Sequence, residues 1–185
     1  SRFDPAAAHR PPAIGPLMRR WFRACDAVAL PYVESALVCL SEVIDRPVYS
    51  LPYPYAIDAI RAAVPPAARS SILLHATRYH VDRSADSRRA EALAAQFGLE
   101  LVEGVGMKWP QWLALVQRAE ICLNLDPTPK VGQVAIECAI LDTPHVGGRA
   151  DAAVALFPDT ATLDLEQIAA SCDRIRQSGY DSGPA

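Results

Sequence analysis

The sequence predicts an α/β protein built on a mostly parallel sheet with covering helices. Strand-like and helix-like segments alternate from residue 72 to residue 146, and 51% of the 185 residues are hydrophobic. A chain of this length can bury a sizeable core. Charge or proline interrupts every apolar stretch well before the ~20 residues of a membrane helix, and no signal-peptide pattern opens the chain. We therefore expect no transmembrane segment and a cytoplasmic location.

Residues 1–50 predict a separate, smaller part of the protein. The chain up to about Pro12 is rich in proline and alanine, which favours an irregular segment. Prolines at positions 52 and 54 indicate a linker, assigned to residues 51–58. The elements expected before the linker are a helix over 15–24, a strand over 26–30, a helix over 34–44 and a strand over 47–51.

Residues 59–177 carry the alternating pattern, and residues 178–185 are expected to form a frayed tail. The last helix is expected to be capped near Asp164, and Ser84 or Asp86 to cap the first. The expected strands are 72–75, 99–102, 121–125 and a short one around Val146. The expected helices run up to about Phe97, from Pro110 to Arg118, from Gly132 to Leu141, from Ala150 to Phe157 and from Leu163 to Ile175.

Glu137 is a charged residue inside an apolar helical pattern. Val134, Ala135 and Cys138 recur at short helical steps, so one face of this helix is apolar. Gln133 and Glu137 lie four residues apart on another face. A carboxylate can accept two hydroxyl hydrogen bonds, and free N–H groups at a helix start favour an anion. The alternative is a solvated helix residue that binds no ligand.

The spacing of Gly132, Glu137 and Pro144, G-x4-E-x6-P, resembles the nucleotide-sugar-binding domain of GT-B glycosyltransferases, most closely the retaining, group 1 type. The resemblance implies a Rossmann-like sheet with helices on both faces. It also implies that Glu137 holds the ribose hydroxyls of the donor nucleotide and that Gly132 lets the donor approach the backbone. The family often carries a second glutamate eight residues earlier. Pro129 stands at that position here, and Lys130 is the nearest charge.

Arg78 and Arg83 fit the same resemblance. They follow the expected strand 72–75 and are separated by four residues. The family has an arginine and then a lysine at this spacing, aimed at the donor pyrophosphate, so Arg78 matches and Arg83 keeps the charge. The resemblance implies that both favour charge developing on the departing diphosphate, with Lys130 adding charge nearby. The alternative is a pair of ordinary surface arginines, although open α/β sheets bind ligands at this end of their strands.

The segment Val105 to Met107 lies where the family lays the nucleotide base. The resemblance therefore implies backbone contacts to the donor from Gly106 and Met107. Trp109 and Trp112 follow directly, and we expect them to pack their helix against the sheet, with base stacking as the alternative.

The resemblance also assigns residues 1–50 to the end of an N-terminal acceptor domain, most of which is expected to be missing. We thus expect a glycosyltransferase, or its donor-binding half, that transfers a sugar from a nucleoside diphosphate sugar to an unknown acceptor. The alternative is a non-catalytic nucleotide-binding or interaction domain of the same fold. An unrelated doubly wound domain, such as a sugar-nucleotide epimerase half or a phosphoacceptor module, is a third class.

Composition disfavours several other kinds of site. A net charge of −3 with dispersed arginines argues against a nucleic-acid partner. The sequence contains no Asp-x-Asp pair and no cluster of histidines with carboxylates, so nothing in it indicates a metal site. We also expect no cofactor besides the donor substrate. The sequence does not decide whether the protein contacts a membrane surface. Five scattered cysteines favour buried thiols, and three histidines are interpreted as structural: His75, His80 and His145.

Overall fold

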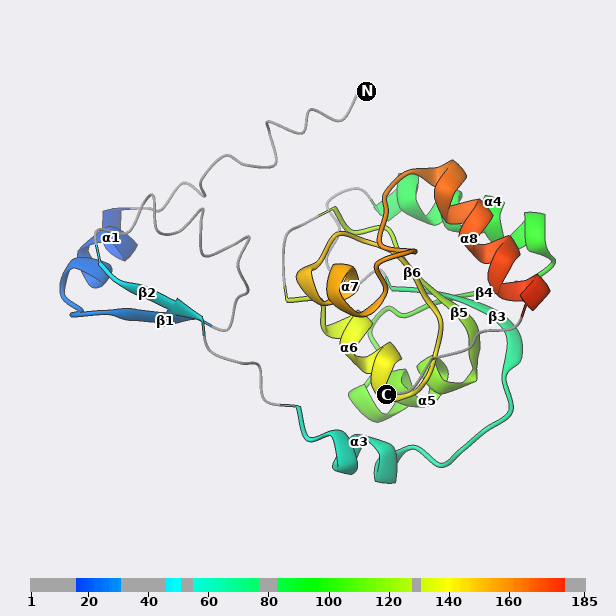
Figure 1. Cartoon of the computed structure of the whole chain (residues 1–185), viewed down its shortest axis with the longest axis horizontal. Coiled ribbons are helices and arrows are strands. Elements are labelled where there is room, and N and C mark those ends of the chain that lie inside the picture. The colour runs from blue at the N-terminus through cyan, green and yellow to red at the C-terminus, as the bar shows by residue number, and fades with distance from the viewer. Residues whose placement is uncertain (1–15, 31–45, 51–54, 77–82, 128–130, 179–185) are drawn as a thin grey trace. The chain divides into compact units, whose positions relative to one another are not determined.

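The computed structural model describes residues 16–30, 46–50, 55–76, 83–127 and 131–178 (Figure 1). The chain divides into two compact units. The smaller unit extends to Tyr55 and includes residues 128–131, and the larger comprises residues 56–127 and 132–185. In the part of the chain that is described, no helix combines the length and apolar character that a bilayer crossing requires.

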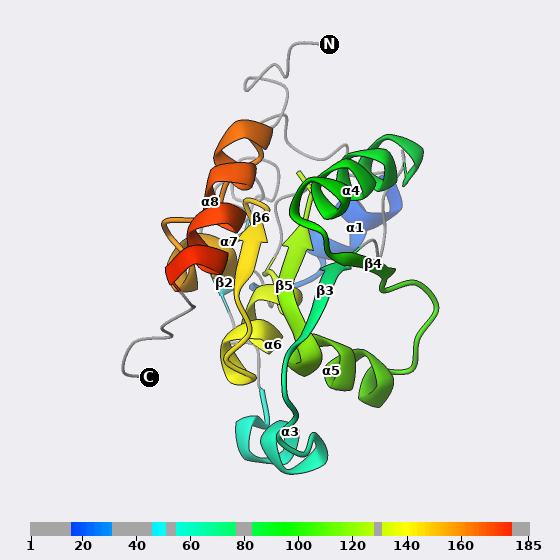
Figure 2. The ribbon, with the colours of Figure 1, turned by 90° about the vertical axis from the view of Figure 1, so that its right-hand side faces the viewer.

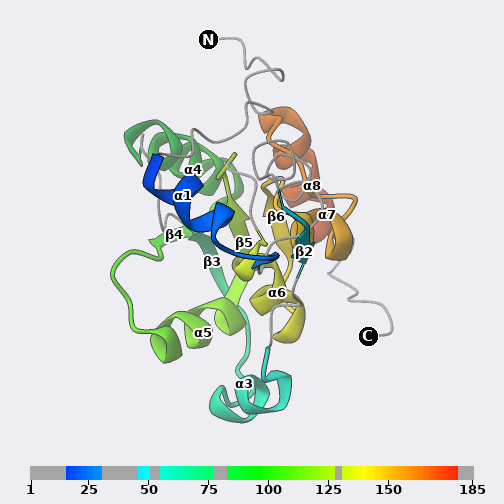
Figure 3. The same ribbon diagram turned by 90° about the vertical axis from the view of Figure 1, so that its left-hand side faces the viewer.

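The smaller unit contains one helix and two short parallel strands. α1 (Pro16–Arg23) leads into β1 (Val28–Leu30), which pairs with β2 (Val48–Ser50) (Figure 3). The helix and strands expected at these places are confirmed with shorter bounds. The helix expected over 34–44 lies outside the described residues, as does the irregular segment expected at the start of the chain.

The larger unit is built on a four-stranded sheet in which every strand runs parallel, in the order β4-β3-β5-β6. Figure 2 shows the arrows of β5 and β6 side by side and pointing the same way. All four strands expected from the sequence are confirmed. Their bounds are β3 Ser70–His75, β4 Glu100–Glu103, β5 Ala119–Asn124 and β6 His145–Gly147.

Helices cover both faces of this sheet, so the larger unit has the expected Rossmann-like α/β fold. In Figure 1, α4 and α8 lie on one side of the strands and α5 and α6 on the other. α3 contacts α6 and was not expected, while the other five helices were. Their bounds are α3 Ile57–Ala63, α4 Arg83–Phe97, α5 Trp109–Arg118, α6 Gln133–Ile140, α7 Asp151–Leu156 and α8 Leu165–Ser178.

The strand order explains which helix covers which face. The chain moves outward from β3 to β4 and then returns past β3 to β5. Because parallel crossovers are right-handed, this reversal places α4 on one face and α5 and α6 on the other. The reversal also creates a switch point at the carboxyl ends of β3 and β5, the place where open α/β sheets bind ligands.

A contiguous cluster of hydrophobic side chains lies beneath α4 and α8. Leu73, Ile121 and Leu123 point from the strands to this face and pack with Leu93 of α4 and Ile168 of α8, and all five are buried. Side chains alternate along a strand, so the neighbours of these strand residues face α5 and α6.

The starts of two helices test the expected caps. Asp164 Oδ1 accepts hydrogen bonds from two backbone N–H groups at the start of α8, at 2.9 and 3.1 Å, so this cap is confirmed. α4 begins at Arg83, which places Ser84 and Asp86 inside its first turn. The expected cap is therefore wrong here, because a capping side chain precedes the first turn.

Candidate functional site

Helix α6 carries the Glu137 carboxylate into the protein interior, where the side chain is only 2% exposed. Its Oε1 accepts a hydrogen bond from Nε1 of Trp109 at 2.8 Å, and its Oε2 accepts one from Nε1 of Trp112 at 2.6 Å. The solvated alternative is wrong, because indole N–H groups take the place of water. Two such donors offset much of the cost of burying the carboxylate.

This Trp–Glu cluster (Trp109, Trp112 and Glu137) follows from the local helix geometry. The two tryptophans are three residues apart on α5, so they share the face that meets α6. Side chains on a helix lean toward its N-terminus, so Glu137 reaches back toward the start of α6. Because α5 and α6 each follow a strand, both begin at the carboxyl edge of the sheet, and the cluster lies near that edge.

The two indoles differ in burial. Trp112 is 4% exposed and belongs to the core, as expected, whereas Trp109 is 43% exposed. The ring of Trp112 lies directly over Gly104, where an added Cβ would come within 2.3 Å of a ring carbon. The N–H of Gly104 donates to the carbonyl of His75 at 3.0 Å, which ties this segment to the end of β3. Glycine at 104 thus makes room for the buried indole.

Gly106 and Met107 lie between this glycine and α5. Gly106 is exposed with a φ of +69°, and Met107 is half-buried. The N–H of Lys108 donates to Oε1 of Gln111 at 3.2 Å and fixes the start of α5. Gly106 and Met107 therefore sit within three residues of Trp109, whose indole binds Glu137. Glu137 is thus hydrogen-bonded to a residue that follows Gly106 and Met107 closely in the chain.

Gly132 immediately precedes α6 and has a φ of +87°. A Cβ added there would lie 2.8 Å from Cβ of Ala150 and 3.2 Å from Cβ of Ala152, so the start of α7 packs against it. Both the backbone conformation and this close packing require glycine. The first N–H groups of α6 follow at the carboxyl edge of the sheet, where they can face an anion.

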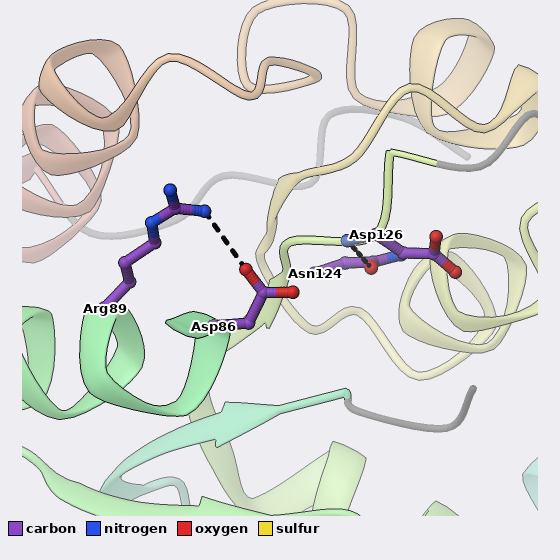
Figure 4. A network of polar contacts seen from close by, with 4 residues as sticks. All are labelled: Asp86, Arg89, Asn124 and Asp126. Atoms are coloured by element: carbon purple, nitrogen blue, oxygen red, sulfur yellow. Dashed lines mark hydrogen bonds and ion pairs between the residues drawn. The ribbon is translucent and has the colours of Figure 1, made fainter. Parts of the chain in front are cut away.

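The ends of β5 and β6 approach one another closely. Oδ1 of Asn124 accepts from the N–H of Asp126 at 2.9 Å and closes the turn after β5 (Figure 4). Gly147 and Gly148 have φ values of +90° and +74°, and a Cβ on Gly147 would lie 2.2 Å from the carbonyl oxygen of Asn124. The glycine pair expected at the end of this strand is therefore needed for the backbone packing.

Two buried carboxylates flank the switch point. Asp86, on the first turn of α4, is 8% exposed, and its Oδ1 accepts from Nη1 of Arg89 at 3.1 Å. Asp126, after β5, is 5% exposed. Figure 4 shows these residues with Asn124 at the edge of the sheet. An anionic ligand bound here would need positive charge to offset them.

The three cations expected to face a diphosphate are not placed. Arg78 and Lys130 lie outside the described residues. Arg83 is the first residue of α4, and its side chain is also outside them. The backbone of Arg83 begins α4, the helix that follows β3, so it lies on the carboxyl side of that strand.

The expectation of buried thiols holds for Cys122, Cys138 and Cys172 and is wrong for Cys25, which is exposed. Cys39 lies outside the described residues. Burial, followed by a hydrogen bond to Cys122, raises the pKa of Cys138 well above its usual value, and burial raises the pKa of Cys172 to about 12. These thiols therefore stay protonated at neutral pH and are poor nucleophiles.

His75 and His145 are both buried. Nδ1 of His75 lies 3.7 Å from Oε1 of Glu103, and the ring of His145 lies 5.2 Å from that of Phe157. His80 is outside the described residues. Within the described ranges, no three histidine, cysteine or acidic side chains are grouped so that they could hold a metal ion.

The tryptophan partners of Glu137 were not expected from the sequence, although a signal was present. An acid in an apolar helix needs a buried donor, and two indoles three residues apart at the start of a neighbouring helix supply two. Comparison of the chain with protein-family models and with curated proteins finds no match in either set. The case for a function therefore rests on the residues and geometry of the larger unit.

Proposed function

We propose that the larger unit binds the nucleoside of a nucleoside diphosphate sugar at the carboxyl edge of its sheet. The observation that carries this proposal is the contact of Glu137 with Trp109, at 2.8 Å. It joins the residue matched to the ribose-binding acid of the GT-B family to the first residue of α5, which follows two residues after Met107 of the segment matched to the base-binding position. A ribose and its base are directly bonded, so their binding groups must be neighbours.

The diphosphate would then lie over the switch point between β3 and β5. Arg78 and Arg83 would neutralise its charge, and Gly132 would open the start of α6 to it. Cations held against the departing diphosphate would favour transfer of the sugar, because they stabilise charge that grows in the transition state. The proposed activity is that of a cytoplasmic glycosyltransferase, or of its donor-binding half, of the retaining GT-B type.

Calorimetric titration with UDP, GDP and ADP tests this proposal. One of the three should bind selectively, and Glu137→Gln should weaken that binding about 10- to 100-fold, the range for a lost hydrogen bond to a charged group. Arg78→Ala should also weaken it. Glu100→Gln is a matched control, because Glu100 is an exposed carboxylate at the amino end of β4, on the opposite edge of the sheet. Unchanged affinity in Glu137→Gln would contradict the proposed nucleoside site.

A second candidate function is nucleotide binding without sugar transfer. Pro129 favours it, because the family often places at this position a glutamate that can contact the donor sugar. The two functions separate in an assay of nucleoside diphosphate release from the donor that the titration identifies. Release above the rate of a Glu137→Gln and Arg78→Ala double variant supports transfer or hydrolysis, whereas tight donor binding without release supports the second function.

A further inference from the structure

The two indoles that bind Glu137 are held very differently. Trp112 is 4% exposed and its ring packs over Gly104, so it belongs to the core. Trp109 is 43% exposed. The hydrogen bond from Trp112, at 2.6 Å, is also shorter than that from Trp109, at 2.8 Å. One donor is part of the core and the other lies at the surface.

Trp109 lies between the Glu137 carboxylate and solvent. Glu137 is 2% exposed although its partner Trp109 is not buried, so the Trp109 side chain is part of the cover over Oε1. Trp109 is also the first residue of α5, and the chain before it includes Gly106 at a φ of +69°. A rotation of this side chain about its own bonds would open Oε1 while the backbone of α5 stays in place.

The chemistry of the uncovered atom defines what can replace the indole. A carboxylate accepts about four hydrogen bonds, and the two indoles use only two of these positions. Once the indole of Trp109 leaves, Oε1 can accept hydroxyl hydrogen bonds from a ligand. With Trp112 still bound to Oε2, Oε1 and the remaining position on Oε2 can accept from two hydroxyls, so a vicinal diol satisfies more of the carboxylate than a single hydroxyl does.

We propose that Trp109 is a movable partner of Glu137, which a vicinal diol of the ligand displaces, while Trp112 stays bound and holds the carboxylate in position. This inference rests on the proposed function, which supplies the ribose of a nucleotide as the diol. Trp109 is thus a positioning residue that keeps the buried carboxylate satisfied in the free protein. Ligand binding exchanges its N–H donor for hydroxyl donors, so the carboxylate is paired in both states.

The indole N–H resonances of the ¹⁵N-labelled protein test this exchange directly. The chain has three tryptophans, and the signal that disappears in Trp109→Phe belongs to Trp109. With the nucleoside diphosphate that binds in calorimetry, the Trp109 signal should shift and that of Trp112 should stay close to its free position. The 2′,3′-dideoxy form of the same nucleotide, which lacks the diol, should leave the Trp109 signal in place.

The affinity of the variants provides the second readout. Trp109→Phe keeps an aromatic ring but removes the competing N–H, so it should bind the ribonucleotide about 2- to 10-fold more tightly, the ratio expected from the net strength of one hydrogen bond. Trp112→Phe removes the fixed donor and should weaken binding. A purely structural Trp109 would give no gain in affinity on substitution by phenylalanine.

The outcomes separate this inference from the proposed function. A ribonucleotide that binds while the Trp109 signal stays unmoved overturns the displacement and leaves the nucleoside site standing. Equal shifts with the ribonucleotide and its dideoxy form overturn the diol as the displacing group. The absence of binding by all three nucleotides would overturn the proposed function, and the displacement with it.

Discussion

The two faces of the four-stranded sheet are packed differently. Under α4 and α8 a contiguous cluster of hydrophobic side chains fills the core, and buried polar groups accompany it at His75, Asp86 and Ser171. Under α5 and α6 the interior also holds the Glu137 carboxylate with its two indole donors, and the hydroxyl of Thr143, which donates to the carbonyl of Val116 at 2.8 Å. Cys122 and Cys138 add a pair of hydrogen-bonded thiols to the buried polar groups.

The difference separates stability from the candidate function. A hydrocarbon face gains free energy from burial alone and depends little on the orientation of its groups. A buried polar group must keep its hydrogen bonds, so each one fixes the position of its partners and is costly when they are lost. Glu137, a buried carboxylate with one surface-exposed indole donor, is therefore more informative about function than a buried leucine beneath α4 and α8.

The largest expected effect is a loss of stability when one buried leucine on each face of the sheet is replaced by alanine. Leu123 faces α4 and α8, while Leu74 points to α5 and α6, and both are fully buried. Leu123→Ala and Leu74→Ala should each lower the free energy of unfolding by about 2–5 kcal/mol, measured by urea denaturation. Only Leu74→Ala should alter the tryptophan emission of the folded protein, because Trp112 is buried on its side of the sheet. An equal change in both variants would remove the distinction between the faces.

The second prediction concerns pH and the histidine at the start of β6. Burial lowers the pKa of His145 from 6.5 to about 4, and neither ring nitrogen has a hydrogen-bond partner among the described residues. The unfolded chain therefore takes up a proton as the pH falls below about 6.5, whereas the folded protein resists it until about 4. The contribution of this histidine to the free energy of unfolding should be fully present above a pH of about 6.5. It should fall by about 3 kcal/mol between that pH and a pH of about 4.

Urea midpoints measured from pH 7.5 down to pH 4 check this prediction. His145→Leu removes the titrating group at similar volume, so the unsubstituted protein should lose stability relative to His145→Leu as the pH falls. Parallel profiles for the two proteins would mean that folding does not lower the pKa of His145, and would contradict this prediction.

The third prediction concerns the space that holds Trp112. Gly104→Ala places a Cβ 2.3 Å from the indole ring, so Trp112 must shift away from Glu137 at a cost of about 1–3 kcal/mol. Gly106→Ala is the control, because no atom lies within 4 Å of its added Cβ and only its positive φ is strained. The indole N–H signal of Trp112 should move in the first variant alone. An unmoved signal in Gly104→Ala would show that the ring has room to spare.

The sequence predicted the order of strands and helices in the larger unit well, because each element has a strong local pattern. Strands such as Ser70–His75 are apolar runs, and helices such as Trp109–Arg118 have a clear start and end. α3 was missed because its short sequence follows a proline-rich stretch and was partly assigned to the linker. Its position depends on tertiary contact with α6, which no local pattern reports.

The candidate site was only partly predictable. Glu137 stood out as a charge in an apolar helix, but the choice between a solvated and a buried side chain depends on which helix packs against it. The indole partners come from α5, and the contact needs the missing side chain at Gly104. The two Trp–Glu pairings join residues more than 20 positions apart and are set by the topology of the sheet. The roles of Arg78, Arg83 and Lys130 stay predictions.

The smallest expected effect is at the start of α8, on the hydrocarbon face. Asp164→Ala removes the acceptor of two backbone N–H groups and should lower stability by about 1 kcal/mol. Asp173→Ala, which removes an exposed carboxylate from the middle of the same helix, should cost less. Neither variant should change nucleotide affinity or the indole signals of Trp109 and Trp112, because α8 packs on the opposite side of the sheet. A change in affinity with Asp164→Ala would mean that the two faces are coupled, and that stability and binding cannot be assigned to separate sides.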